Sequence, residues 1–238
     1  MSINLGFKRL LSYLSLTGLL LASMAWANPA RNVTLTFEVN MGDLKIGKGI
    51  DKLQHNSSVY TLSSKIIPKG LASLFLSKIE RESKGSIVLE GLRPDYFSET
   101  GNKKKGSREA TFDWVNNQLT LVTKNGRETL PLTIFSADQA TLPYLFSFQA
   151  KLPDTSSIHI TDGRRLKLYK YQRQEDDVLT TAIGEVRVAH FKKIIKNEND
   201  RQFEFWLSYE HNFLPVKLKF VDKKGNVIQS TVTSVTTD

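Results

Sequence analysis

The chain has no cysteine among its 238 residues, and it has only four histidines. The first absence excludes disulfides, thiolate metal sites and a cysteine nucleophile, so packing alone must stabilise the fold. None of the histidines is spaced from another as a ligand pair on one element, and the H-E-x-x-H motif is missing. We therefore expect no metal and no other cofactor.

Catalytic motifs are also missing. There is no G-x-S-x-G nucleophile elbow. Gly47-Lys48-Gly49 resembles part of a phosphate-binding loop, but it lies in an alternating strand pattern and no helix follows it. The carboxylates of Glu80 and Glu82 alternate with basic residues, which is typical of a solvated face. No catalytic residue is predicted, and a hydrolase site would have to assemble in three dimensions alone.

The charge pattern does not favour nucleic acid as a partner. The net charge is +9, but no long basic stripe is interleaved with aromatic residues. Lys103, Lys104 and Lys105 lie between two glycines and predict a hairpin tip. Such a tip either contacts an anionic membrane surface or is a plain solvated loop.

The first 27 residues have the pattern of a cleavable export signal. Lys8 and Arg9 precede an apolar stretch that is too short to span a bilayer comfortably, and Ala25-Trp26-Ala27 supplies a small-x-small cleavage site. Asn28 follows the expected cut after Ala27, so there is no thiol to lipidate. We expect residues 1–27 to be a signal peptide and the mature protein to be soluble and not a lipoprotein.

Alternation of apolar and polar residues dominates positions 28–238. Each alternating run predicts a strand with one dry face, and glycine- and asparagine-rich turns between the runs favour antiparallel hairpins. The expected strands cover 32–39, 44–53, 59–67, 79–89, 95–100, 108–114, 119–123, 157–160, 166–172, 185–190, 203–209, 216–221 and 227–235. The fold class is therefore all-β, in one domain with a weak seam near 150–157.

Two apolar segments interrupt the alternation. Residues 70–77 predict a short helix, and so do residues 136–152, where Ser136 or Asp138 is placed to cap the start and Pro143 limits the length. We expect both segments to lie on the dry concave face of a curved sheet.

Aromatic residues are the candidates for ligand binding. They lie in the second apolar segment and in a late strand: Tyr144, Phe146, Phe148, Phe203, Phe205 and Trp206. If the sheet curls around the segment, these side chains either fill a core or line an apolar cavity.

Short motifs in a fixed order resemble those of the exported bacterial proteins grouped as domain of unknown function 3108. They are Ser83-x-Gly85, Gly91-Leu92-Arg93-Pro94, Tyr96-Phe97, Phe112-Asp113-Trp114, Asp162-Gly163-Arg164 with Tyr169, Thr181-x-Ile183-Gly184-Glu185, Trp206-Leu207-Ser208, Leu214-Pro215-Val216 and Gly225. The resemblance covers most of residues 28–238. The sequence departs from the family pattern at Ala137-Asp138-Gln139-Ala140, which is followed by Pro143.

The resemblance implies a periplasmic protein of Gram-negative bacteria with no assigned activity. It also implies a half-open antiparallel barrel wrapped around a helix, similar to that of the lipoprotein-localisation carriers. Arg93 then either bonds carbonyls at the barrel rim or meets an anionic ligand. The leading hypothesis is a non-catalytic binder of an apolar or amphipathic, lipid-like ligand or of an envelope component. The alternatives are an envelope-assembly scaffold and a hydrolase. The sequence does not indicate the oligomeric state.

Overall fold

The structure is a computed structural model that describes residues 29–101, 106–149, 151–197 and 200–238. The expected signal peptide and the lysine tip at 103–105 lie outside these residues. Two short 3₁₀ helices are described, η1 (Gly70–Leu74) and η2 (Leu142–Phe148). The strands are β1 (Asn32–Met41), β2 (Leu44–His55), β3 (Val59–Pro68), β4 (Ile79–Val88), β5 (Gly91–Thr100), β6 (Arg108–Asp113), β7 (Gln118–Thr123), β8 (Gly126–Pro131), β9 (Ser136–Asp138), β10 (Thr155–Thr161), β11 (Leu166–Arg173), β12 (Asp177–Thr181), β13 (Gly184–Lys193), β14 (Gln202–Ser208), β15 (Leu214–Val221) and β16 (Val227–Thr237).

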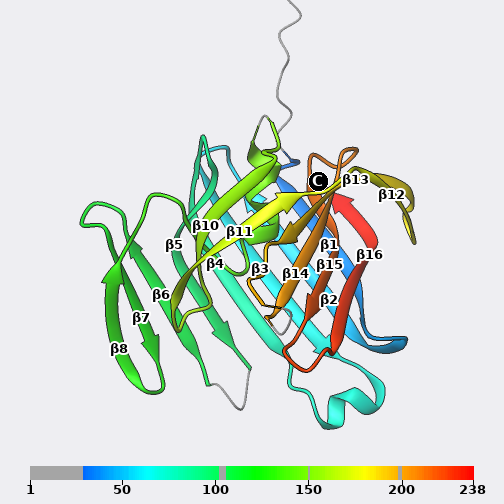
Figure 1. Ribbon diagram of the computed structural model, residues 1–238, viewed down its shortest axis with the longest axis horizontal. Helices are drawn as coiled ribbons and strands as arrows, with labels where there is room; N and C mark the ends of the chain where they lie inside the picture. The colour runs from blue at the N-terminus through cyan, green and yellow to red at the C-terminus, as the bar shows by residue number, and fades with distance from the viewer. Residues whose placement is uncertain (1–28, 102–105, 150, 198–199) are drawn as a thin grey trace, which may run out of the picture.

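All of these strands belong to one 16-stranded sheet. Its order is β8-β7-β6-β5-β4-β3-β2-β1-β16-β15-β14-β13-β11-β10-β9, with β12 attached to β13. The strands β1 and β16 pair with each other (Figure 1). The strands β8 and β9 form the two ends of the sheet and do not pair. Neighbouring strands are antiparallel except β9 and β10. The prediction of a curved, half-open antiparallel sheet is confirmed.

Three strands were not predicted, namely β8, β9 and β12. Every residue of β8 and β12 is exposed or half-exposed, so neither shows the apolar alternation that marks a half-buried strand. β9 has only three residues, all buried. The strands β8 and β12 thus have little dry surface to cover, and β9 is too short to show an alternating pattern.

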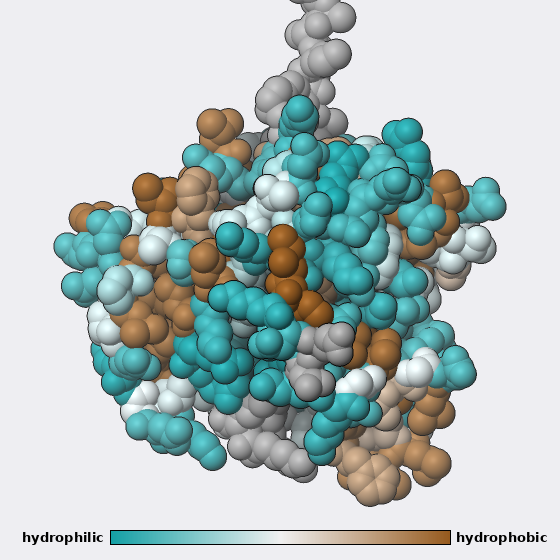
Figure 2. Space-filling view, in the orientation of Figure 1, coloured by the Kyte–Doolittle hydropathy of each residue, from teal (hydrophilic) through white to brown (hydrophobic). Residues whose placement is uncertain are grey.

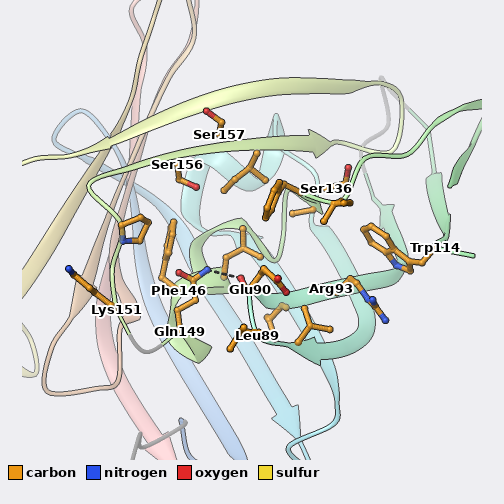
Figure 3. Close-up of a pocket in the computed structure, with 18 of the residues that line it drawn as sticks. Leu89, Glu90, Arg93, Trp114, Ser136, Phe146, Gln149, Lys151, Ser156 and Ser157 are labelled. Atoms are coloured by element: carbon orange, nitrogen blue, oxygen red, sulfur yellow. Dashed lines mark hydrogen bonds between the residues drawn. The ribbon is translucent and has the colours of Figure 1, made fainter.

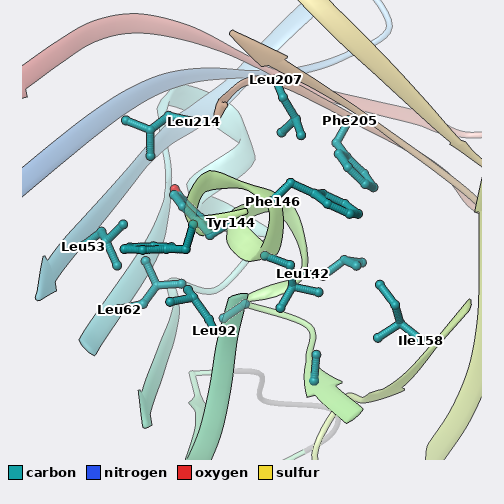
Figure 4. Packing of buried hydrophobic residues seen from close by; sticks show 14 of the residues in the cluster. Leu53, Leu62, Leu92, Leu142, Tyr144, Phe146, Ile158, Phe205, Leu207 and Leu214 are labelled. Atoms are coloured by element: carbon teal, nitrogen blue, oxygen red, sulfur yellow. The ribbon is translucent and has the colours of Figure 1, made fainter. Parts of the chain in front are cut away.

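The second apolar segment lies inside the curved sheet, as expected. All seven residues of η2 are buried, and Figure 4 shows Tyr144 and Phe146 surrounded by core side chains from strands far apart in the sequence. The helix is shorter than the predicted 136–152. Pro143 stands at its start, and residues 136–138 form a strand instead. The interior of the barrel is therefore filled around η2 rather than hollow.

Asp138 starts the turn that leads into η2. Its Oδ1 accepts the backbone N–H groups of Ala140 (2.8 Å) and Thr141 (2.9 Å), and its Oδ2 accepts the hydroxyl of Ser83 (2.6 Å). The side chain is completely buried. Burial raises the pKa of Asp138 to about 6, although these hydrogen bonds oppose the rise.

Stability is expected to depend on the protonation of Asp138. Because the folded pKa exceeds that of an unfolded aspartate, the protonated form favours folding, and this contribution is lost as the pH rises from about 4 through 6. The shift corresponds to about 3 kcal/mol. The variant Asp138→Asn keeps a side-chain oxygen that can accept the N–H groups of Ala140 and Thr141, but it cannot titrate. Its free energy of unfolding in urea, relative to that of wild type, should therefore rise by about 3 kcal/mol between pH 4 and pH 7.5. A constant difference across this range would contradict the assignment.

An ion-pair network crosses the seam that the sequence predicts near 150–157. Glu99 on β5 accepts hydrogen bonds from Arg81 Nε (2.7 Å), from Gln139 Nε2 (2.7 Å) and from Arg108 Nη2. Arg108 also pairs with Asp162, which follows β10, at 3.3 Å. Burial alone would raise the pKa of Glu99, but Arg81 and Arg108 hold it below its ordinary value. The ion pair between Arg108 and Asp162 thus links the two halves of the chain in addition to the sheet.

The first apolar segment does not lie on the concave face, and that expectation is wrong. η1 has no buried residue, and Leu71, Leu74 and Phe75 are 80, 73 and 85 % exposed. The space on the concave face is already taken by η2 and its neighbours. The segment instead projects from the connection between β3 and β4 (Figure 1).

Candidate ligand-binding pocket

A half-open pocket of about 650 Å³ lies where the β4–β5 turn faces η2 and β10 (Figure 3). Its volume is within the range of small-molecule sites. The apolar side chains that line it include Leu92, Leu145, Phe146 and Ile158 in the interior and Leu89, Ile134 and Phe135 at the exposed margin. The pocket is therefore continuous with the core at one end and with solvent at the other.

One wall of the pocket depends on Gly91. Its φ is +112°, and a Cβ atom there would lie 2.2 Å from the carbonyl oxygen of Leu145 in η2. Only glycine allows the β4–β5 turn to approach η2 this closely. The approach is fixed at its outer end by Gln149, whose Nε2 donates to the carbonyl of Glu90 at 2.6 Å (Figure 3).

Charged groups border this apolar space. Arg93 lies over the ring of Trp114, 5.4 Å from the centroid, and Trp114 Nε1 donates to the carbonyl of Pro94. The buried Nε of Arg93 has no hydrogen-bond partner within the described residues. Lys151 lies on the opposite side of the pocket and Glu90 between them (Figure 3). Two cations and one carboxylate leave a net positive margin around an apolar interior, which suits an anionic amphiphile.

The candidate ligand-binding residues from the sequence are divided between this pocket and the core. Arg93 and Phe146 line the pocket. Tyr144 is buried and donates to Asp51 Oδ2 at 2.6 Å, and Phe148 packs edge-on against His55. Neither lies in the pocket lining.

The three candidates on β14 lie away from the pocket. Phe205 is fully buried against Phe146 and Phe191, and Phe203 is only partly buried beside it. Trp206 faces the other side of the strand, where it stacks on His190 at 4.2 Å. The ligand-binding role of these residues stays a prediction.

Sequence reasoning missed the residues of the exposed margin, Leu89, Ile134 and Phe135. A signal was present, since all three are large apolar residues at the margins of expected elements: Leu89 is the last residue of the expected strand 79–89, and Ile134 and Phe135 directly precede the expected helix 136–152.

One hydroxyl–histidine contact borders the pocket. Thr133 Oγ1 lies 3.1 Å from Ser136 Oγ and 2.9 Å from His159 Nδ1, and Ser136 lines the pocket. In the part of the chain that the structure describes, no hydrogen bond or ion pair joins a carboxylate to His159. Among those same residues, no group of three or more histidine, aspartate or glutamate side chains is placed to hold a metal ion. No described helix is long and apolar enough to cross a membrane.

Comparison with known proteins gives a family and a fold. The family model described as "Protein of unknown function (DUF3108)" matches residues 36–233. No curated protein matches the chain. A β-barrel-like protein of the domain of unknown function DUF1849 from Brucella abortus is 8 % identical, with a TM-score of 0.59 over 88 % of this chain and 98 % of that chain. This likeness shows a shared fold.

A putative outer membrane lipoprotein-sorting protein domain from Vibrio parahaemolyticus is 9 % identical. The alignment covers 90 % of this chain and 86 % of that chain, with a TM-score of 0.24. It adds nothing to the fold assignment.

Proposed function

Because the chain belongs to the DUF3108 family, whose description assigns no activity, we propose a function from the pocket itself: a non-catalytic carrier of a single anionic amphiphile. The observation that carries the proposal is the half-open apolar pocket of about 650 Å³ with Arg93 and Lys151 at its margin. An acyl chain would lie against Leu145, Phe146 and Ile158, and a carboxylate or phosphate headgroup would stay near the cations.

The same proposal places the protein in the periplasm. The pattern of residues 1–27 supports export, and the absence of cysteine suits an oxidising compartment, where free thiols react. A carrier in this compartment would move its ligand through the aqueous space between two membranes.

A pocket-filling variant tests the carrier function. Ser156 lines the pocket and is only half-buried, so Ser156→Phe should occupy the cavity without removing a core side chain. Titration with a fluorescent fatty acid is expected to show saturable binding to wild type and roughly tenfold or weaker binding to Ser156→Phe. Ser230→Phe, on β16 and outside the pocket lining, is the matched control and should bind like wild type.

A charge variant tests the headgroup. Arg93→Gln is expected to weaken the binding of the fatty acid but not that of the corresponding fatty alcohol. Only the acid presents a carboxylate to the guanidinium of Arg93. Absence of saturable binding to wild type would contradict the carrier function and favour the scaffold role.

Hydrolysis is the second candidate, favoured by the contacts of Thr133 with Ser136 and His159 beside the pocket. A nucleophile of this kind needs a base that is oriented by a third group. The described residues supply no such carboxylate for His159, so the carrier role is better supported. If wild type hydrolyses a fatty-acyl ester and Ser136→Ala does not, hydrolysis would be better supported than the carrier role.

A further inference from the structure

A compact apolar projection extends from the connection between β3 and β4, at the lower right of Figure 1. We define the apolar tip as Leu71, Leu74, Phe75 and Leu76. Its turn is held by hydrogen bonds of its own, from Ser73 Oγ to the carbonyl of Gly70 (2.7 Å) and from the Leu76 N–H to the carbonyl of Ala72 (2.8 Å). The four apolar side chains are 47 to 85 % exposed, so this ordered structure buries none of them.

Further exposed apolar residues lie next to the tip. The Lys69 N–H donates to the carbonyl of Ile46 at 2.9 Å, which fixes the tip beside the β1–β2 turn. Met41 and Leu44 of that turn are themselves exposed. Figure 2 shows hydrophobic side chains gathered at the lower right, where Figure 1 places η1 and the β1–β2 turn. Contiguous exposed apolar surface of this kind marks an interaction site.

The charges around the tip are mostly positive. Lys65, Lys69 and Lys78 occur between positions 64 and 79 and no acidic residue does. Lys65 and Lys78 share a single partner, Glu80, at 2.9 and 3.0 Å. The β15–β16 turn adds Lys223, Lys224 and Asp222 at the same end of the sheet, since the Gly42 N–H donates to the carbonyl of Val227. The β1–β2 turn adds Asp43, so the lysines outnumber the acidic residues. Lysines beside exposed apolar side chains match a surface with anionic headgroups above an apolar layer.

We propose that the apolar tip docks the protein on an anionic lipid bilayer, with Leu74 and Phe75 inserted among the lipids and the flanking lysines at the headgroups. Because the apolar tip projects from the protein, its side chains can enter the fluid interface of a bilayer. The proposal concerns a different surface from the pocket, and it stands whether or not the pocket binds an amphiphile.

The absence of cysteine allows a clean test. Ala72→Cys, labelled with an environment-sensitive dye, places one probe on η1 beside the apolar tip and leaves the hydrogen bond of Ser73 intact. On addition of vesicles of phosphatidylethanolamine and phosphatidylglycerol, the dye emission should shift to the blue and be quenched by brominated acyl chains. Vesicles of phosphatidylcholine alone should give a much weaker response, and added salt should weaken the response to anionic vesicles.

Vesicle co-sedimentation of unlabelled protein identifies the residues. Leu74→Ser combined with Phe75→Ser should lower the apparent affinity roughly tenfold or more, because inserted apolar surface is lost. Val115→Ser is the matched control: this residue is 89 % exposed in another turn, and its variant should bind like wild type. Since all three side chains are exposed, folding should not change.

Other outcomes overturn the proposal. The first is that wild type does not bind vesicles. The second is that Val115→Ser lowers the affinity for vesicles as much as the double variant does. The third is that wild type is a dimer that does not bind vesicles and that the double variant converts to a monomer. Ser156→Phe separates the two surfaces, since vesicle binding should survive in that pocket-filled variant.

Discussion

Gly91→Ala is expected to lower the free energy of unfolding by about 3–5 kcal/mol, combining backbone strain with overpacking. The alanine would have to adopt a φ of +112°, and its Cβ would lie 2.2 Å from the backbone carbonyl of Leu145. The clash forces the β4–β5 turn away from η2, which opens the wall of the pocket. The folded fraction of the variant should therefore also bind the fluorescent fatty acid more weakly.

Gly184→Ala is the matched control for this change. Gly184 has a φ of +106°, almost the same as Gly91, but nothing lies within 4 Å of the position where its Cβ would stand. The free energy of unfolding of Gly184→Ala should fall by about 1–3 kcal/mol, because only backbone strain is added. Urea unfolding of both variants separates the two effects. Equal losses would show that the close contact between Gly91 and η2 does not matter for stability.

Glu99→Gln is expected to destabilise the protein by about 3–5 kcal/mol, the cost of breaking a buried ion pair from one side. The substitution leaves the buried Arg108 with only the longer contact to Asp162, and it removes the charge that Arg81 faces. Because the network joins β4, β5 and β6 to Gln139 and to the β10–β11 turn, the loss should weaken the contact between the halves of the chain.

Glu82→Gln provides the comparison for Glu99→Gln. Glu82 pairs with Lys84 at 2.9 Å, but both side chains are largely exposed, so the expected loss is below about 1 kcal/mol. Thermal and urea unfolding of the two variants measure the difference. Similar losses would mean that the network around Glu99 is no more important than a surface pair.

Most strands of the sheet could be predicted from the sequence, because a half-buried strand needs alternating apolar and polar side chains. On β1, Val33, Leu35, Phe37 and Val39 are all buried, as their spacing predicts. The solvated face predicted for Glu80 and Glu82 is confirmed as well, since both carboxylates are partly exposed and pair with exposed lysines. Asp138, one of the two predicted caps, does hold the turn into η2.

The buried charges were not predicted, although the alternating pattern indicated them. Glu99 lies on the same buried face of its strand as Phe97, and Arg108 lies on the same buried face as Phe112. Opposite charges at inward positions of neighbouring strands indicate a buried pair, because neither is stable there alone.

The pocket itself was not predictable from local pattern. Its lining comes from the β4–β5 turn, η2 and β10, which only the whole topology brings together. The same limit explains the error at residues 70–77: the apolar composition was clear, but not that η2 had already filled the concave face.

Photolabelling with a photoactivatable fatty acid decides whether the pocket is the binding site, because it reports where a bound amphiphile lies. The carrier account predicts labelled peptides from residues 88–93 and 151–158, loss of label when unlabelled fatty acid is in excess, and loss of label in Ser156→Phe. Label that is spread over the surface, or that persists unchanged in Ser156→Phe, would contradict it.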